Sequence, residues 1–482
     1  MAQVVIVGAG ISGLATAYHL QELLPQAEIT VLEAQPRPGG TIWTERRDGF
    51  QVEIGPNGFT ASKLSTFKLC QKLDLLGELI PARPETKTRY LYLNGHLHRL
   101  PGSLWQLLRS PLLGWRTKWR LFAEGWQPRR SEPGDESVYD FVARRVNTDV
   151  ADLFADALVT GIYAGDPRLL SLPAAFPRVA ECELTYGSVR KGLTQMAKAR
   201  RGEAQALGLD LPRQSGGLFS FKRGLRFLIE MLAVRLRKPP LFSTAVRSLT
   251  HRLDPAGKPS WIAATDGQHH WPADAVVLTC PAYRQAAMLS DVDPDLADLL
   301  LQIPYSPAVV VALGYREHPV GADLRAFGYI TPQRTRRDVL GVQFCSSIFP
   351  ERAPEGCMLM RAICGGWHRR NITVWDDDQL SLAVRREMRQ VLGISERPIF
   401  MHITRWDRAI PQYHLGHLER VAQIEAQAAQ QPGLFLSGNA YRGVSLNDCT
   451  EQAELLAHQV AAYLKSPRTT ANSDRRDRNV SL

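Results

Sequence analysis

Cysteine is scarce in this sequence and is not placed as a disulfide framework or a zinc site would require. The seven cysteines are scattered over 482 residues, and no two of them form a C-x-x-C pair. Disulfide-stapled domains and structural zinc sites use closer and more regular spacings. We therefore expect reduced, mostly buried thiols in a cytosolic protein, and no metal site.

No hydrophobic run is long enough to cross a membrane. The longest apolar stretches, residues 4–17 and 307–314, are interrupted by Gly, Ser or Pro, whereas a spanning helix needs about 20 apolar residues. A basic leader is also lacking, because a strand is predicted almost at once from Val4. We expect no signal peptide and a cytoplasmic location, with which attachment to the surface of the cytoplasmic membrane is compatible.

Acidic residues are outnumbered by basic ones. The sequence has 48 Asp and Glu against 58 Lys and Arg, so the formal net charge is +10. Such a surplus favours an anionic partner, which could be nucleic acid, an acidic membrane surface or an anionic substrate. Nucleic acid is not expected, because no recognised motif or basic–aromatic stripe of that kind is present. The length predicts two or three domains, and the 44% apolar fraction is typical of globular proteins.

The first 33 residues carry the pattern of a dinucleotide-binding turn. A buried strand is predicted at 4–7, then Gly8-x-Gly10-x-x-Gly13, a helix at 14–24 and a second strand at 28–32. Glu33 follows that strand, twenty residues beyond Gly13. A lone glycine fingerprint is weak evidence, but here strand, turn, helix, spacing and acid all agree.

Each element of this turn has a physical purpose. Gly8 permits the tight turn, Gly10 lets the backbone approach a pyrophosphate, and Gly13 allows close packing of helix on sheet. The helix N-terminus directs free N–H groups and a positive dipole end at the phosphates. Glu33 can accept hydrogen bonds from a ribose diol, so a dinucleotide is the expected cofactor.

The next residues favour FAD over NAD. Glu33-x-x-x-Arg37-x-Gly39-Gly40 resembles the extended fingerprint of the glutathione-reductase-like FAD superfamily, in the branch of the flavin amine oxidases. The implied fold class is α/β, with a Rossmann-like FAD-binding domain, a mixed α+β substrate domain and a helical membrane-associating insert.

Such an FAD domain is discontinuous, and further strand-like runs at 275–279 and 433–439, with a helical pattern at 447–464, suit that organisation. Three segments, 1–85, 216–292 and 430–464, are predicted to form the FAD-binding domain. Between them we expect a helical membrane-associating or substrate insert at 86–215 and a substrate-binding domain at 293–429. A disordered tail is predicted at 465–482.

Ser103 to Trp126 has an unusual composition. It carries four tryptophans and four cations but only one acid, Glu124. Tryptophan beside basic residues suits an interfacial helix on an anionic lipid surface. The alternative is that the tryptophans fill a helical core while the cations are solvated, and the sequence does not decide between them.

Several stretches together resemble the oxygen-dependent protoporphyrinogen IX oxidases, in order and from residue 3 to about 464. The most diagnostic are Pro411-Gln412-Tyr413-x-x-Gly416-His417 and Gly443-Val444-x-x-Asn447-Asp448-Cys449. The resemblance implies that the flavin N5 takes hydride from a methylene bridge of protoporphyrinogen IX, and that O2 reoxidises the flavin to give hydrogen peroxide. Because the cofactor carries this chemistry, no catalytic side chain is expected.

The resemblance also implies the residues that contact FAD. They are Gly8, Ala9, Gly10, Ile11, Ser12, Gly13, Glu33, Ala34, Arg37, Gly40, Thr41, Gly55, Pro56, Asn57, Gly58, Val246, Val444, Ser445 and Leu446. Val246 falls in a run at 242–249 that is predicted to be a strand whose backbone meets the adenine.

Four residues are candidates for substrate binding by the same resemblance. Arg89 matches the arginine that pairs with a substrate propionate, and arginine is the best bidentate carboxylate clamp. Its alternative is a strand arginine bonded to Glu85 or to water. Ile330, Gln343 and Ile363 fall where relatives use apolar and aromatic side chains against the substrate rings. Gln343 is polar and Ile363 lacks an aromatic face, which puts the exact substrate in doubt.

Other functions stay open. The nearest is a coproporphyrinogen III oxidase of the same fold, whose tetra-propionate substrate would suit the extra basic residues. More distant ones are an amine oxidase, a carotenoid desaturase, or a protein that binds flavin and tetrapyrrole without oxidising it. Besides substrate and O2, the candidate partners are an anionic membrane surface, neighbouring haem-pathway enzymes and a second copy in a homodimer.

Overall fold

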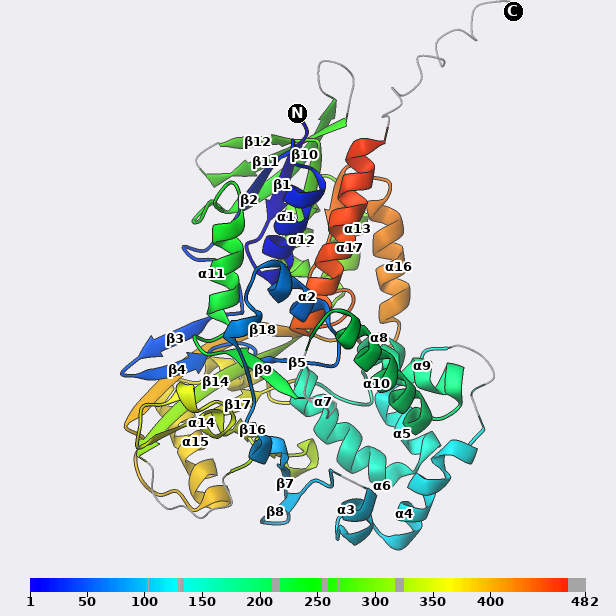
Figure 1. The fold of residues 1–482 in the computed structure, drawn as a ribbon, viewed down its shortest axis with the longest axis vertical. Coiled ribbons are helices and arrows are strands. Elements are labelled where there is room, and N and C mark those ends of the chain that lie inside the picture. The colour runs from blue at the N-terminus through cyan, green and yellow to red at the C-terminus, as the bar shows by residue number, and fades with distance from the viewer. Residues whose placement is uncertain are drawn as a thin grey trace, which may run out of the picture.

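A computed structural model describes residues 1–102, 104–128, 130, 134–209, 217–253, 259–266, 269–316 and 325–466. Figure 1 shows three regions. The parallel sheet with the N-terminus is at the top, a second sheet is at the lower left, and a group of helices is at the lower right.

The first sheet has four parallel strands in the order β19-β13-β1-β2. They are β1 (Gln3–Val7), β2 (Glu28–Leu32), β13 (Ala275–Leu278) and β19 (Leu434–Leu436). Both faces of this sheet are covered, which explains the uninterrupted apolar runs in its strands. Its strands come from three distant regions of the chain, as a discontinuous FAD domain requires.

Helices cover one face of this sheet. They are α1 (Ile11–Leu23), α2 (Ser65–Lys72), α11 (Arg226–Arg235) and α17 (Leu446–Lys465), which share one apolar core. The other face packs against an antiparallel sheet and three helices: β10 (Val246–Leu253), β11 (Pro259–Thr265), β12 (His270–Ala273), α12 (Ala282–Leu289), α13 (Pro294–Leu301) and α16 (His417–Ala428).

The second sheet has seven strands in the order β18-β14-β17-β16-β15-β7-β8. They are β7 (Arg89–Leu93), β8 (His96–Arg99), β14 (Tyr305–Arg316), β15 (Gly328–Ile330), β16 (Val339–Gln343), β17 (Cys357–Gly365) and β18 (Phe400–Pro411). Helix α15 (Asp377–Leu392) packs on one face through Leu380, Val384 and Met388. β7 and β8 lie inside the segment expected to be largely helical, so the start of that segment belongs to the substrate sheet instead.

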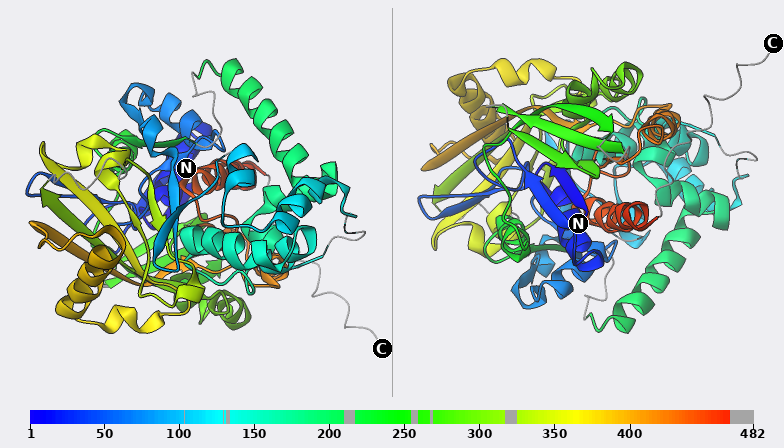
Figure 2. Two further views of the ribbon diagram at one scale, coloured as in Figure 1. Left: turned by 90° about the horizontal axis from the view of Figure 1, so that it is seen from below. Right: turned by 90° about the horizontal axis from the view of Figure 1, so that it is seen from above.

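The helical region follows β8 in the chain. Its helices are α3 (Leu104–Arg109), α4 (Trp115–Phe122), α5 (Val138–Arg145), α6 (Thr148–Val150), α7 (Asp156–Tyr163), α8 (Leu172–Ala175), α9 (Pro177–Tyr186) and α10 (Val189–Ala206). The buried Arg145 pairs with Glu124 and, at 3.2 Å, with Glu183, which ties several of these helices together. α10 is the long helix that extends past the others in Figure 2, and its Glu203 pairs with Lys68 of α2 at 2.7 Å.

Short elements connect these regions. They are the hairpin β3 (Thr44–Arg47) and β4 (Phe50–Glu53), the small sheet β5 (Phe59–Thr60), β9 (Leu218–Phe221) and β6 (Leu79–Pro81), the helix α14 (Cys345–Ile348), and the 3₁₀ turn η3 (Ala123–Trp126).

Element positions differ from the sequence predictions mainly at their ends. α1 starts three residues before the predicted Leu14, and the strand predicted from Phe242 begins only at Val246. Lys465, placed in the predicted tail, is the last residue of α17. The tail from residue 467 onward lies outside the described residues. Among the described helices, none combines the length and apolarity needed to span a bilayer.

Candidate cofactor and substrate site

The glycine turn at the carboxyl end of β1 has the geometry of a pyrophosphate cradle. A Cβ on Gly13 would lie 1.9 Å from the carbonyl oxygen of Gly8, so helix and turn meet too closely for any side chain. Gly8 has a φ of +108°, which only glycine adopts easily. At Gly10, by contrast, a Cβ would meet no protein atom within 4 Å. Its half-buried backbone is therefore open to a ligand at the N-terminus of α1.

Glu33 lies at the end of β2 and is buried. Its Oε2 accepts a hydrogen bond from the backbone N–H of Ala9 at 2.7 Å, and its Oε1 accepts one from Gln35 at 2.9 Å. The carboxylate thus holds the glycine turn, and its remaining lone pairs are available to a ribose diol. Ala34 beside it is exposed.

The segment after Glu33 folds back against the glycine turn. Gly39 donates its N–H to the carbonyl of Ala9 at 2.8 Å, and a Cβ on Gly40 would lie 3.8 Å from Cα of Gly10. Arg37 donates to the carbonyl of Gly40 at 3.2 Å, and its guanidinium lies 4.5 Å from the centre of the Trp43 ring. Arg37 therefore braces this segment beside the proposed pyrophosphate position.

Residues 55–58 form the next wall of the predicted cofactor site. A Cβ on Gly55 would lie 1.9 Å from the carbonyl oxygen of Thr41, so these two predicted contacts are packed together. Asn57 is only 7% exposed, yet neither its Oδ1 nor its Nδ2 has a partner among the described residues. A buried amide without partners costs about 1–3 kcal/mol. Its orphaned atoms fit a bound flavin, whose ring edge carries both donors and acceptors.

The N-terminus of α17 completes the site. Ser445 caps the helix, accepting from the N–H of Asp448 in a capping box. Leu446 shares the apolar core of Ala9 and Ile11, and Asn447 donates to the carbonyl of Thr60 at 2.7 Å. These contacts place residues 444–446 between the glycine turn and the strand that follows Gly58. The buried Ile11 and Ser12, also predicted contacts, belong to the first turn of α1.

Val246 is placed near Glu33 by the segment that precedes it. The backbone N–H of Glu33 donates to Leu241 at 2.9 Å, and Thr244 donates to the carbonyl of Glu33 at 2.8 Å. This segment therefore runs beside the acid, and Val246, which begins β10, lies at its end. The arrangement suits a backbone contact to adenine.

The four predicted substrate residues share one face of the seven-stranded sheet. Arg89 of β7 is in register with Gly328 of β15, which is in register with Gln343 of β16. In the adjacent row, Ile330 is in register with Gly341, which is in register with Ile363. Because residues directly opposite one another in a sheet project from the same face, all four side chains belong to one surface.

The other face of these strands is filled. Tyr329, Val342 and Ala362, which alternate with the residues of the two rows, are buried in the core beneath α15. The face that carries Arg89 meets α7 at one end, where a Cβ on Gly161 would lie 3.0 Å from Cδ1 of Ile330. Towards β14 it meets the FAD-binding region, where Trp406 of β18 donates to the carbonyl of Ile54 at 2.9 Å. The predicted substrate face therefore lies between the helical region and the predicted flavin site.

Arg89 has no counter-ion in the described regions of the chain. No described carboxylate lies within salt-bridge distance of it, so the alternative pairing with Glu85 is not formed. Its guanidinium stacks over Phe327 at 4.6 Å. Solvent reaches the side chain, yet the surrounding protein lowers the pKa of Arg89 by desolvation. Such a cation is placed to receive an anionic group.

The row of Arg89 continues to a residue that sequence reasoning missed. Gln343 is in register with Arg361 of β17, which is 5% exposed. A signal was available in the sequence, because Arg361 is the one charged residue in the otherwise apolar or small run Cys357–Gly365.

The tryptophans of the segment 103–126 are on the surface. Trp105, Trp115, Trp119 and Trp126 are 74%, 68%, 66% and 85% exposed. The alternative that they fill a helical core is therefore wrong. Arg116 lies 5.5 Å from the ring of Trp115, so the cations and aromatic rings share this surface.

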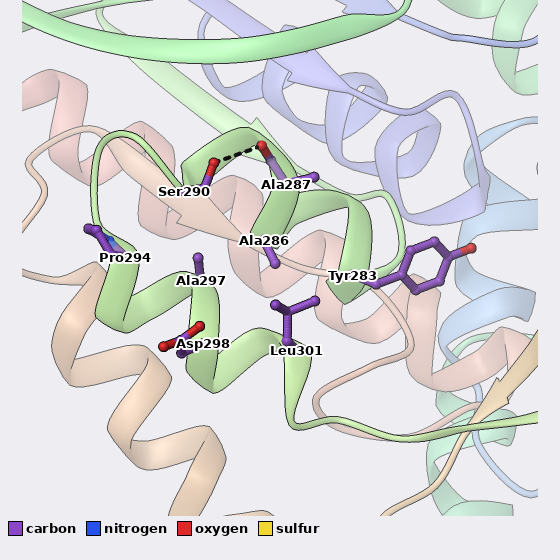
Figure 3. A pocket seen from close by; sticks show the side chains of 8 residues that line it. All are labelled: Tyr283, Ala286, Ala287, Ser290, Pro294, Ala297, Asp298 and Leu301. Carbon is purple, nitrogen blue, oxygen red and sulfur yellow. Dashed lines mark hydrogen bonds between the residues drawn. The ribbon is translucent and has the colours of Figure 1, made fainter.

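One pocket lies apart from this site. A pocket of about 230 Å³ between α12 and α13 is lined by Tyr283, Ala286, Ala287, Ser290, Pro294, Ala297, Asp298 and Leu301, and it contains none of the predicted site residues (Figure 3).

The residues that the structure describes hold no group of three His, Cys, Asp or Glu that could ligate a metal ion.

The glycine turn, the buried acid, the loop with Asn57 and the capped helix together form a site that fits a dinucleotide such as FAD. The chain belongs to the flavin-containing amine oxidoreductase family, whose model matches residues 11–461.

Relatives within this family cover nearly the whole chain. The chain is 32% identical to a chloroplastic protoporphyrinogen oxidase of Nicotiana tabacum, over 95% of this chain and 85% of the relative. It is 29% identical to a coproporphyrinogen III oxidase of Bacillus subtilis, over 96% and 98% of the two chains. A crystal structure from Exiguobacterium sp. 255-15, provisionally assigned as a protoporphyrinogen oxidase, matches with a TM-score of 0.80 and 26% identity, over 96% of this chain and 99% of that one.

Proposed function

We propose that this chain oxidises a porphyrinogen to a porphyrin in haem biosynthesis, with O2 as the acceptor and hydrogen peroxide as the second product. The observation that carries the proposal is the position of one sheet face. It presents an unpaired arginine and apolar side chains directly beside the predicted flavin site. Relatives named for two porphyrinogens support the same substrate class.

When bound, FAD supplies the acceptor for the electrons that leave the substrate. The protein's own residues bind and orient. Arg89 would hold a propionate by charge-assisted hydrogen bonds, while Ile330 and Ile363 would pack against the macrocycle. The face is closed by α7 on one side and the FAD-binding region on the other, which limits water around the reacting carbon. No acid–base side chain is required of the protein for these roles.

Protoporphyrinogen IX is the first candidate substrate. Its two propionates need one cationic anchor region, and Arg89 supplies it. Coproporphyrinogen III is the second candidate, and Arg361 at the other end of the Arg89 row is the observation that favours it.

The experiment is an aerobic assay of the purified FAD-loaded protein with each porphyrinogen. Appearance of porphyrin fluorescence, with uptake of O2 and release of hydrogen peroxide, is the expected result. A protein that holds FAD and oxidises neither compound would contradict the proposal.

We also propose that the exposed tryptophans attach the protein peripherally to an anionic membrane. Four exposed indoles beside basic residues are the composition of an interfacial surface. Replacing Trp115 and Trp119 with alanine should reduce co-flotation with vesicles that contain anionic lipid, while flavin content is unchanged. Equal flotation of parent and variant would contradict this attachment. The cytoplasmic location, a homodimer and contacts with neighbouring haem-pathway enzymes stay predictions.

A further inference from the structure

The row that begins at Arg89 runs across four strands of the substrate sheet. In register, it reads Arg89, Gly328, Gln343 and Arg361. Gly328 leaves a gap in the row, so the surface between Arg89 and Gln343 carries no side chain. With neighbouring strands about 4.8 Å apart, the backbones of the two arginines are about 14 Å apart.

Arg361 is a buried cation whose charge no described side chain neutralises. It donates one hydrogen bond, from Nη1 to the backbone carbonyl of Glu53 at 2.9 Å, and its buried Nε has no partner among the described residues. Burial lowers the pKa of Arg361. A buried charge without an opposite charge is costly, so the site is suited to a ligand that supplies the opposite charge.

The nearest carboxylate is already occupied. Glu53 Oε1 pairs with the fully buried Arg352 at 3.2 Å and accepts from the N–H of Leu225, and its Oε2 accepts from the hydroxyl of Thr44. One glutamate therefore faces two arginines, and its negative charge is neutralised by the ion pair with Arg352. The excess positive charge of this cluster belongs to Arg361.

Gln343 adds a second polar group beside Arg361. Its Oε1 is buried and has no partner among the described residues. The two side chains are direct cross-strand neighbours, so an amide and a guanidinium with unused hydrogen-bonding capacity lie next to each other. The guanidinium donors of Arg361 match a carboxylate, whereas the orphaned Oε1 of Gln343 is itself an acceptor and requires a donor.

We infer that Arg361 forms a second carboxylate anchor, which takes a substrate propionate on the edge of the macrocycle opposite the one held by Arg89. This inference rests on the proposed function and deepens it. A porphyrinogen with propionates on all four rings, as in coproporphyrinogen III, fills both anchors. Protoporphyrinogen IX has vinyl groups on the far edge and fills only the anchor of Arg89.

The test compares the two porphyrinogens with a charge-removing variant of similar volume, Arg361→Met. Loss of a charge-assisted hydrogen bond should lower kcat/KM for coproporphyrinogen III by about 10- to 100-fold. The value for protoporphyrinogen IX should change by less than about 3-fold, since no partner is lost there. Binding of the two porphyrin products, followed by fluorescence, should show the same selectivity. Arg386→Met, on the outer face of α15, is the matched control and should leave both values unchanged.

An equal fall for both porphyrinogens would overturn the inference. A shifted flavin reduction potential, with no change in the ratio of the two kcat/KM values, would also overturn it, because Arg361 would then act on the cofactor. If Arg361→Met fails to fold, Arg361→Gln carries the test and should lower the ratio of kcat/KM for coproporphyrinogen III to kcat/KM for protoporphyrinogen IX by about 10-fold. An unchanged ratio in Arg361→Gln also overturns the inference. Parent protein that oxidises neither porphyrinogen contradicts the proposed function instead.

Discussion

Replacing Gly10 with alanine should weaken FAD binding and leave the fold unchanged, whereas replacing Gly13 should damage the fold itself. Gly10 has a φ of −73° and a ψ of 179°, which alanine adopts without strain, and its Cβ would meet no protein atom within 4 Å. The new methyl group would project into the open space where the pyrophosphate is expected. At Gly13 the same methyl group would lie 1.9 Å from the carbonyl oxygen of Gly8 and 2.7 Å from Oγ1 of Thr279.

These contacts set the magnitudes. Loss of close approach at Gly10 removes a charge-assisted backbone hydrogen bond to phosphate, worth about 1.5–3 kcal/mol, so the Kd for FAD should rise about 10- to 100-fold. Overpacking of a core typically costs about 1–3 kcal/mol. Because the clash at Gly13 is with backbone that cannot rotate away, we expect a loss at or above the upper end of that range.

The assay measures two quantities on protein stripped of FAD. Thermal unfolding gives the stability of the apoprotein, and titration with FAD gives the Kd. Gly202→Ala is the control, because its Cβ also meets nothing within 4 Å and it lies in α10, far along the chain from the turn. Equal FAD affinity in Gly10→Ala and Gly202→Ala would refute the cradle at Gly10. An unfolding temperature in Gly13→Ala equal to that of the parent would refute the packing argument.

Two further predictions concern single side chains. Arg89→Ala should raise KM for a porphyrinogen about 10- to 100-fold and lower kcat much less, since the propionate contact is uniform binding; steady-state kinetics identical to the parent would refute the assignment. His417 is buried, and its burial lowers its pKa from 6.5 to about 4. The unfolded chain therefore takes up the proton first, so stability should fall by about 3 kcal/mol as the pH drops from about 6.5 to 4. Chemical denaturation at several pH values should show that the free energy of unfolding falls less with acid in His417→Gln than in the parent. An identical fall in both proteins would contradict the prediction.

The glycine turn was predictable because its signal is local. Spacing within 33 residues determines the strand, the turn, the helix and Glu33, and the structure has each of them. The strand at 242–249 was predicted too early, since the residue pattern of this run does not show where pairing starts. In the structure β10 pairs with β11 from Val246 onward.

The substrate face was only partly accessible to sequence reasoning. Arg89, Ile330, Gln343 and Ile363 came from resemblance, and nothing in their local sequence shows that they share a surface. That fact depends on the register of β7 with β15, β16 and β17, which follow it more than 200 residues later in the chain. Arg361 stands out in the sequence as the one charge of an apolar run, but its role depends on its neighbours across the sheet. The exposure of the four tryptophans likewise depends on how the helices pack, which composition does not determine.

Anaerobic photometry of the FAD-loaded protein tests the central claim most directly. The account predicts that adding a porphyrinogen bleaches the oxidised flavin band and produces porphyrin, and that admitting O2 restores the band. A flavin spectrum that stays oxidised at saturating porphyrinogen would contradict the claim that this sheet face presents the substrate to the cofactor.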